Sequence, residues 1–240
     1  MIYYNLADQD FKLSNRSSVG IYNVSLQLGL NLAKTLPLTF LLNKNANLNF
    51  DNSINRKVLK NNNKLANRFL FDQFGLYKQV EYKKNDWIFL PKGFSSFCKV
   101  PPCKLAVYIH DDVYNFWKEN YPKYRSKILH KYFFLGLKSS ILNADVIFTN
   151  SNFTSNEIRL FKRRNNIYKS SYITNIGIGF DHLNYSWEKK DKKGILVYIS
   201  NWPHKNSIKI IDFLSKWQNQ KNFKDPIYFL GSIPNGIYLP

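Results

Sequence analysis

The 240-residue chain has only two cysteines, one methionine and few acidic side chains. Cys98 and Cys103 cannot build a disulfide framework, and no second cysteine pair is present to complete a zinc site. We expect both thiols to be free. The sequence also lacks the roughly 18 uninterrupted apolar residues of a membrane span. Its amino-terminal segment lacks the basic start and long apolar region of a secretory signal. A cytoplasmic location is therefore expected.

Acidic residues are outnumbered by basic ones, with 16 Asp and Glu against 35 Lys and Arg and a net charge of +19. Aromatic residues make up 17% of the chain. This combination fits a nucleic acid, an anionic membrane surface or phosphate-bearing substrates as partners. A coding bias toward Asn, Lys and Ile explains the composition equally well. The basic residues are scattered and no nucleic-acid-binding module is recognisable, so nucleic acid is not the expected partner.

Short apolar segments alternate with helical patterns along the chain, which predicts an α/β fold with a parallel sheet. Strands are expected at residues 3–4, 38–42, 87–90, 105–109, 146–149, 172–176, 195–199 and 227–230. Helices are expected at residues 21–34, 65–74 and 124–143, after Thr154 and after Pro203. The Asn- and Lys-rich residues 43–63 are expected to form a loop, and residues 112–122 to be irregular.

The charged residues 185–194 carry no apolar period and are expected to link two parts of the chain. Residues 1–184 would then form one large domain. Residues 195–240 provide little more than one βαβ unit, which is too short for an independent second domain.

The wholly apolar run at residues 105–109 predicts a strand buried on both faces, and His110, Asp111 and Asp112 follow it directly. Ligands of parallel sheets bind outside the carboxyl ends of the strands. His110 could take part in proton transfer or bind a hydroxyl, or it could be a structural histidine at a strand end. The two carboxylates could orient His110 or bind a sugar hydroxyl, or they could cap a turn or helix.

Three further segments carry candidate binding residues. Ser18 and Gly20 precede a predicted helix, whose first backbone amides favour anions, although the G-x-G-x-x-G pattern is absent. Lys205 and Asn206 follow a buried strand and precede another helix, where Lys205 could face a phosphate. Ser151 follows the strand at 146–149 and could reach the same cleft. Each of these residues could instead be an ordinary helix cap or part of a solvated turn.

Five segments together resemble glycosyltransferase family 4, the retaining enzymes of the GT-B fold. The second of these segments combines residues 91–93 with residues 107–111, which read Val-Tyr-Ile-His-Asp. The other four are residues 20–28, 144–158, 178–181 and 197–206. Each motif is weak alone, but their order and spacing extend over nearly the whole chain. The resemblance is nearest in character to bacterial mannosyl- and rhamnosyltransferases of surface-polysaccharide assembly.

The resemblance implies two Rossmann-like domains with the active site between them. The first domain would bind the acceptor, a growing polysaccharide or lipid-linked glycan, and the second would bind the nucleotide-sugar. Gly20 would lie near the donor phosphate and the acceptor, His110 would meet the transferred sugar, and Lys205 would meet the diphosphate. The family needs no metal or cofactor besides the nucleotide-sugar substrate. A lipid-linked acceptor implies a peripheral position on the inner face of the membrane.

The sequence departs from the family pattern at two points. Ser200 and Asn201 stand where the family often has an arginine shortly before the lysine. The E-x7-E carboxylates that bind donor sugar and ribose would fall beyond Pro240. We therefore expect a truncated second domain. The chain could act with another polypeptide, or it could be a non-catalytic remnant or acceptor-binding module without a donor site.

Overall fold

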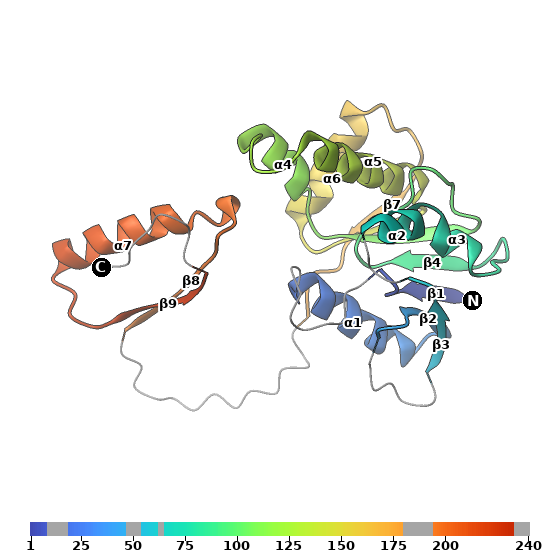
Figure 1. The fold of residues 1–240 in the computed structure, drawn as a ribbon, viewed down its shortest axis with the longest axis horizontal. Coiled ribbons are helices and arrows are strands. Elements are labelled where there is room, and N and C mark those ends of the chain that lie inside the picture. The colour runs from blue at the N-terminus through green and yellow to red at the C-terminus, as the bar shows by residue number, and fades with distance from the viewer. Residues whose placement is uncertain (9–18, 47–53, 62–64, 180–193, 233–240) are drawn as a thin grey trace. The chain divides into compact units, whose positions relative to one another are not determined.

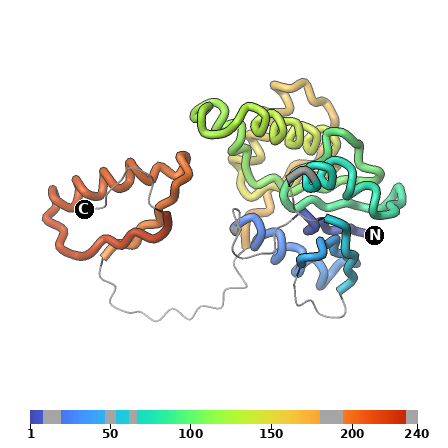
Figure 2. The backbone as a smooth tube through the Cα atoms, viewed as in Figure 1, coloured from blue at the N-terminus to red at the C-terminus, as the bar shows by residue number. Residues whose placement is uncertain are grey.

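The computed structural model describes residues 1–8, 19–46, 54–61, 65–179 and 194–232 (Figure 1). The chain divides into two compact units, which are described separately. Unit 1 comprises Met1–Glu119 and Lys123–Gly179, and unit 2 comprises Asn120–Pro122 and Phe180–Pro240. Figure 2 traces the same backbone from the first residue to the last.

Unit 1 contains a seven-stranded sheet in which every neighbouring pair of strands is parallel, in the order β3-β2-β1-β4-β5-β6-β7. The strands are β1 (Ile2–Asn5), β2 (Leu38–Asn43), β3 (Asn55–Leu59), β4 (Trp87–Leu90), β5 (Lys104–Ile109), β6 (Val146–Thr149) and β7 (Tyr172–Asn175). The helices are α1 (Val19–Ala33), α2 (Leu65–Leu70), the π-helix η2 (Phe71–Gly75), α3 (Leu76–Lys78), α4 (Val113–Asn120), α5 (Lys127–Asn143) and α6 (Asn152–Arg164). The α/β class and the parallel sheet are confirmed, and the topology is compatible with a Rossmann-like fold.

Strand β5 lies in the interior of unit 1 and is buried on both faces, as its apolar sequence predicts. Leu105, Val107 and Ile109 belong to a core cluster that includes buried side chains of α5 and α6. Ala106 and Tyr108 belong to a second cluster, against which α1 packs. The helices accordingly lie on opposite sides of the sheet, with α1 on one side and α5 and α6 on the other (Figure 1). Both faces of β5 are therefore covered from Leu105 to Ile109.

Two of the expectations for unit 1 are wrong. The expected loop at residues 43–63 contains the edge strand β3, which carries no apolar pattern because only Leu59 of its five residues is buried. Backbone pairing with β2 holds this strand in the sheet. The expected irregular segment at residues 112–122 contains the helix α4, in which Trp117 is the buried residue. Strand β3 is mostly solvent-exposed, so hydrophobic periodicity does not reveal it, whereas α4 is amphipathic but has only eight residues, which is short for recognising a helical period.

Unit 2 contains the parallel strands β8 (Ile195–Ile199) and β9 (Ile227–Gly231), the short 3-10 helix η3 (Pro203–Lys205) and the helix α7 (Ser207–Lys221). Both strands and the helix agree with the expectations from sequence. Residues 185–193 of the expected linker lie outside the described residues. Several apolar side chains of the two strands are exposed: Leu196, Tyr198, Tyr228 and Leu230.

Candidate functional site

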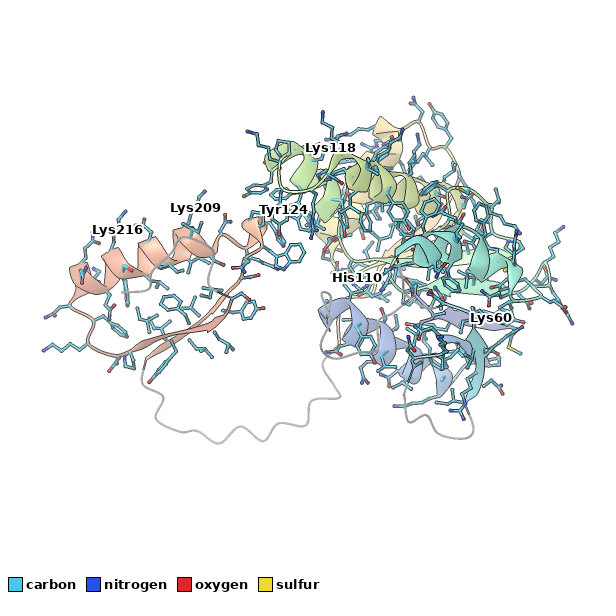
Figure 3. All side chains as sticks on the ribbon, viewed as in Figure 1. Lys60, His110, Lys118, Tyr124, Lys209 and Lys216 are labelled. Atoms are coloured by element: carbon cyan, nitrogen blue, oxygen red, sulfur yellow. The ribbon has the colours of Figure 1, made fainter. Side chains whose placement is uncertain are left out.

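His110 follows β5 directly, at the carboxyl edge of the sheet (Figure 3). Its Nε2 atom lies 2.8 Å from the carbonyl oxygen of Pro91, which follows the neighbouring strand β4. A carbonyl oxygen only accepts hydrogen bonds, so Nε2 carries the proton. In the neutral ring, Nδ1 is then the acceptor. The ring also packs against Tyr108, with ring centroids 4.4 Å apart.

The His110 side chain is neutral at neutral pH because of its surroundings. Only 9% of the residue is exposed, and burial lowers the pKa of the imidazole. The hydrogen bond to Pro91 and the charge of Asp111 oppose this shift, while the charge of Lys92 adds to it. A neutral imidazole with Nδ1 as acceptor can take a hydrogen bond from a hydroxyl group.

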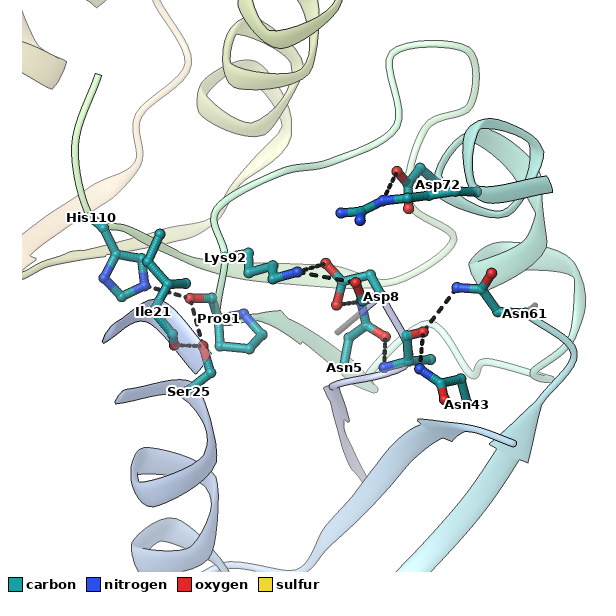
Figure 4. A network of polar contacts seen from close by, with 12 residues as sticks. Asn5, Asp8, Ile21, Ser25, Asn43, Asn61, Asp72, Pro91, Lys92 and His110 are labelled. Carbon is teal, nitrogen blue, oxygen red and sulfur yellow. Dashed lines mark hydrogen bonds and ion pairs between the residues drawn. The ribbon is translucent and has the colours of Figure 1, made fainter. Parts of the chain in front are cut away.

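The first turns of α1 meet the His110 site through the same carbonyl group. Ser25 Oγ lies 2.7 Å from the carbonyl oxygen of Ile21 and 3.4 Å from that of Pro91 (Figure 4). For Gly20, in the first turn of α1, no atom of the described residues outside its own helix turn lies within 4 Å of the place where a Cβ would stand. The structure therefore brings Gly20 and His110, two residues predicted for the site, to one edge of unit 1.

Three asparagines continue this edge across the neighbouring strands β1, β2 and β3. Asn43 and Asn61 both donate from Nδ2 to the carbonyl oxygen of Ala7, at 3.1 Å and 2.9 Å. Asn5 Oδ1 accepts from the Ala7 amide at 3.1 Å (Figure 4). Sequence reasoning missed these residues. The sequence feature that could have identified them is an asparagine at or just beyond the end of each of these three strands.

A group of charged residues lies beside the asparagines, and sequence reasoning missed it as well. Lys92 Nζ lies 3.0 Å from the carbonyl oxygen of Asp8 and 3.5 Å from its carboxylate (Figure 4). Burial lowers the pKa of Lys92, against the opposing charge of Asp8. Burial, followed by the charge of Asp8, raises the pKa of Asp72 to about 6. Arg68 and the hydroxyl of Tyr132 partly offset that shift.

Asp111 and Asp112 make local contacts at the start of α4. Asp111 is exposed, and its Oδ1 accepts from the Val113 amide at 3.3 Å. Asp112 Oδ2 accepts from Asn115 Nδ2 at 2.7 Å, and burial raises the pKa of Asp112 to about 6. The contact at Nε2 that orients His110 comes from Pro91 rather than from either carboxylate.

Ser151 is the N-cap of α6, where its Oγ accepts from the Thr154 amide at 3.1 Å. The sequence predicts the helix after Thr154, but it begins at Asn152, so Ser151 rather than Thr154 is its capping residue. Thr154 is buried instead, and its hydroxyl donates to the backbone oxygen of His110 at 3.2 Å. Ser151 therefore holds Thr154 in place, and Thr154 in turn contacts the backbone of His110.

The remaining predicted site residues are divided between the undescribed part of the chain and unit 2. Ser18 lies outside the described residues. Lys205 is exposed and ends η3, and Asn206 has a left-handed backbone with a φ of 54°. The loop before α7 is held by Ser207, which was not predicted. Its Oγ accepts from the Ser200 amide at 2.8 Å and donates to the Ser200 oxygen at 2.9 Å.

Cys98 and Cys103 are both free thiols, as expected. Burial raises the pKa of Cys103 to about 11, so this thiol is protonated at neutral pH. Within the described parts of the chain, no three His, Cys, Asp or Glu side chains gather in a way that could hold a metal ion. None of the helices that the structure describes combines the length and apolar character needed to cross a bilayer.

A comparison of the chain with protein-family models and with curated protein sequences finds no match to either.

Proposed function

We propose that the chain is a retaining glycosyltransferase of family 4 with a GT-B arrangement. It would move a hexose from a nucleotide-sugar to a growing polysaccharide or lipid-linked glycan. The observation that carries the proposal is the buried, neutral His110 at the carboxyl end of β5, joined through Pro91 to the first turns of α1. Open sheets of this kind bind ligands at this edge. The order of the family-like motifs gives separate support.

In the proposed reaction, the acceptor oxygen forms a bond to the anomeric carbon of the hexose while the bond from that carbon to the diphosphate breaks. The electron pair stays on the leaving phosphate oxygen, which takes up the proton of the acceptor hydroxyl. His110 binds a hydroxyl of the transferred sugar through Nδ1. Lys205 stabilises the charge that develops on the leaving nucleotide.

Two features of unit 1 fit an anionic substrate near His110. The amides of the first turn of α1 favour a negative group, and Gly20 leaves room for it to approach the backbone. Lys92, held by Asp8, adds a cation close enough to lower the pKa of His110. We propose that Lys92 compensates in part for the arginine that the family often places before the lysine.

The proposal is tested by measuring the release of nucleoside diphosphate from a panel of nucleotide-sugars, with lipid-linked glycans extracted from membranes as acceptors. His110→Asn and Lys205→Gln should each reduce transfer at least tenfold, since each removes a contact to the reacting groups. Lys209→Gln, which changes an exposed lysine on α7, is the matched control for Lys205 and should leave transfer unchanged.

Undiminished transfer in both His110→Asn and Lys205→Gln would refute the proposed roles. Binding of a glycan acceptor by the wild-type chain with no transfer from any nucleotide-sugar would support an acceptor-binding module instead. A peripheral position on an anionic membrane is part of the proposal, because basic side chains bind such surfaces. Flotation with vesicles that shows no preference for anionic lipid would remove that part.

A further inference from the structure

A pocket of about 780 Å³ lies in unit 1 away from His110, at the carboxyl ends of β2 and β3. Its walls come from the last residues of β3, from residues just after β2 and β3, and from the segment that contains α2, η2 and α3. Gln79, which follows α3, forms two hydrogen bonds with Lys60, which follows β3. Its Oε1 accepts from the Lys60 amide at 2.6 Å, and its Nε2 donates to the Lys60 backbone oxygen at 3.3 Å. The volume is in the range of sites that bind small ligands.

The polar part of the pocket is cationic. Lys44, Lys60 and Lys78 line it, and the described residues of its lining include no Asp or Glu. All three lysines are exposed. The ammonium group of Lys78 lies 5.6 Å from the ring centroid of Phe74, another lining residue. Three cations without a carboxylate attract an anionic group such as a phosphate.

Exposed apolar side chains form another part of the pocket lining. Val58 is 61% exposed and Leu70 is 54% exposed, although both are large hydrophobic residues. They line the pocket together with Phe74. A ligand that covered these side chains would remove apolar surface from water. A free inorganic anion would use the lysines but would leave this wall uncovered.

We propose that this pocket binds a phosphate group carried on an apolar chain. The charge selects the phosphate, and the exposed apolar wall selects the chain. The identification of this ligand as the lipid carrier of the acceptor glycan rests on the proposed function, whereas the binding site itself does not. In the sheet, β3 lies four strand positions from β5. Neighbouring strands are about 4.8 Å apart, so the phosphate would lie roughly 19 Å from the strand that carries His110.

Figure 3 labels Lys60 and His110 at these separate places on unit 1. Substitutions in the pocket therefore leave the His110 site intact. They test the pocket independently of sugar transfer.

The test is calorimetric titration of the full chain at low salt with farnesyl phosphate, farnesol and inorganic phosphate, each below its aggregation concentration. Wild-type protein should bind farnesyl phosphate at least tenfold more tightly than farnesol or inorganic phosphate, because only farnesyl phosphate uses both walls. The double variant Lys60→Gln/Lys78→Gln should weaken binding about 25-fold, since each cation near an anionic group contributes roughly fivefold. Leu70→Gln should weaken binding of farnesyl phosphate and leave that of inorganic phosphate unchanged.

Lys84→Gln is the matched control. Lys84 is exposed in the turn before β4, so it lies at the amino-terminal ends of the strands, whereas the pocket lies at the carboxyl ends of β2 and β3. It should bind farnesyl phosphate like the wild type. Equal binding of all three probes by the wild type, or equal weakening by Lys84→Gln and the pocket variant, would overturn the proposal. His110→Asn should keep full binding, so loss of transfer and loss of pocket binding are distinguishable.

Discussion

The Nε2 atom of His110 and the carbonyl oxygen of Pro91 are 2.8 Å apart, and this contact joins the ends of the neighbouring strands β5 and β4. It fixes the tautomer of the ring. We predict that His110 is neutral and protonated at Nε2 at pH 7, because burial lowers its pKa. Nitrogen-15 NMR of the imidazole groups should show this tautomer. A signal from a ring protonated at Nδ1 would contradict the prediction.

The same shift makes His110 contribute to the pH dependence of stability. The folded-state pKa lies below the unfolded value of 6.5, so the unfolded chain takes up the proton first as the pH falls. The stability contributed by His110 should therefore be complete above pH 6.5 and decrease as the pH falls below that value. Urea unfolding of the wild type and of His110→Asn measures this, because the difference in stability between the two proteins should change as the pH falls below 6.5 and should be constant above it.

Asp72 should produce the opposite dependence. Its pKa is raised from 3.8 to about 6, so the folded chain takes up this proton at a higher pH than the unfolded chain. Its contribution to stability is present below about pH 4 and is lost as the pH rises through 6. At pH 7.5, Asp72→Asn should be more stable than the wild type by up to about 3 kcal/mol, because the substitution removes a desolvated charge.

Asp145 is the matched control for Asp72. Burial raises its pKa, but the Leu105 amide at 2.8 Å and Lys169 at 3.0 Å outweigh that effect and lower it. Asp145→Asn should therefore remove stability that is present at neutral pH and is lost in acid. Asp72→Asn and Asp145→Asn with pH dependences of the same sign would show that these environments are misjudged.

Two glycines of α1 give a matched pair of substitutions. A Cβ on Gly29 would lie 2.7 Å from Phe40 Cε1 and 2.8 Å from Tyr4 Cε1, and both rings are fully buried. Gly29→Ala should therefore destabilise the protein by about 1–3 kcal/mol through overpacking. Gly20→Ala meets no neighbouring element among the described residues and should gain up to about 1 kcal/mol from helix propensity.

Thermal unfolding checks both glycine variants. Equal effects of Gly29→Ala and Gly20→Ala would contradict the close packing of α1 on Tyr4 and Phe40. Gly20→Ala should also impair sugar transfer while it leaves the fold intact, because its methyl group would occupy the space proposed for the anionic substrate.

Ser151 offers a test of the support beneath His110. Ser151→Ala should cost about 1 kcal/mol, because the Thr154 amide loses its capping partner. Ser151→Asp should restore most of that stability, since a carboxylate accepts the same hydrogen bond and favours the helix N-terminus. Denaturant unfolding measures both variants. Equal loss in Ser151→Asp would show that the residue acts through packing rather than as a cap.

The sequence predicts the buried part of the fold well and the exposed part poorly. Strand β5 is apolar in five consecutive residues because both of its faces are covered. Strand β3 has a single buried residue, so backbone pairing holds it and its side chains carry no signal. Helix α4 is different, because it is amphipathic and Tyr114 stacks on Phe133 of α5, but its eight residues are few for a helical period to be recognised. Hydrophobic pattern reports burial, so an edge strand held mainly by backbone hydrogen bonds escapes it.

The site shows a related limit. His110 is predictable because a titratable residue follows an apolar run. Its partner Pro91 is not predictable, because the contact uses a main-chain oxygen and depends on β4 lying beside β5. The convergence of Asn43 and Asn61 on Ala7 depends in the same way on the strand order β3-β2-β1. Residue types identify groups that can do chemistry, whereas strand order decides which of them meet.

The all-parallel sheet of unit 1 also determines how the chain must reach its native state. Parallel neighbours cannot be joined by a tight turn, so every pairing waits for a crossover segment to fold. Strand β1 pairs with β4 only after β2 and β3 have been traversed. Such non-local closure slows folding to milliseconds or longer and leaves strand edges open in the meantime. Refolding at low protein concentration, or with a chaperone present, should therefore recover more native protein than rapid dilution at high concentration.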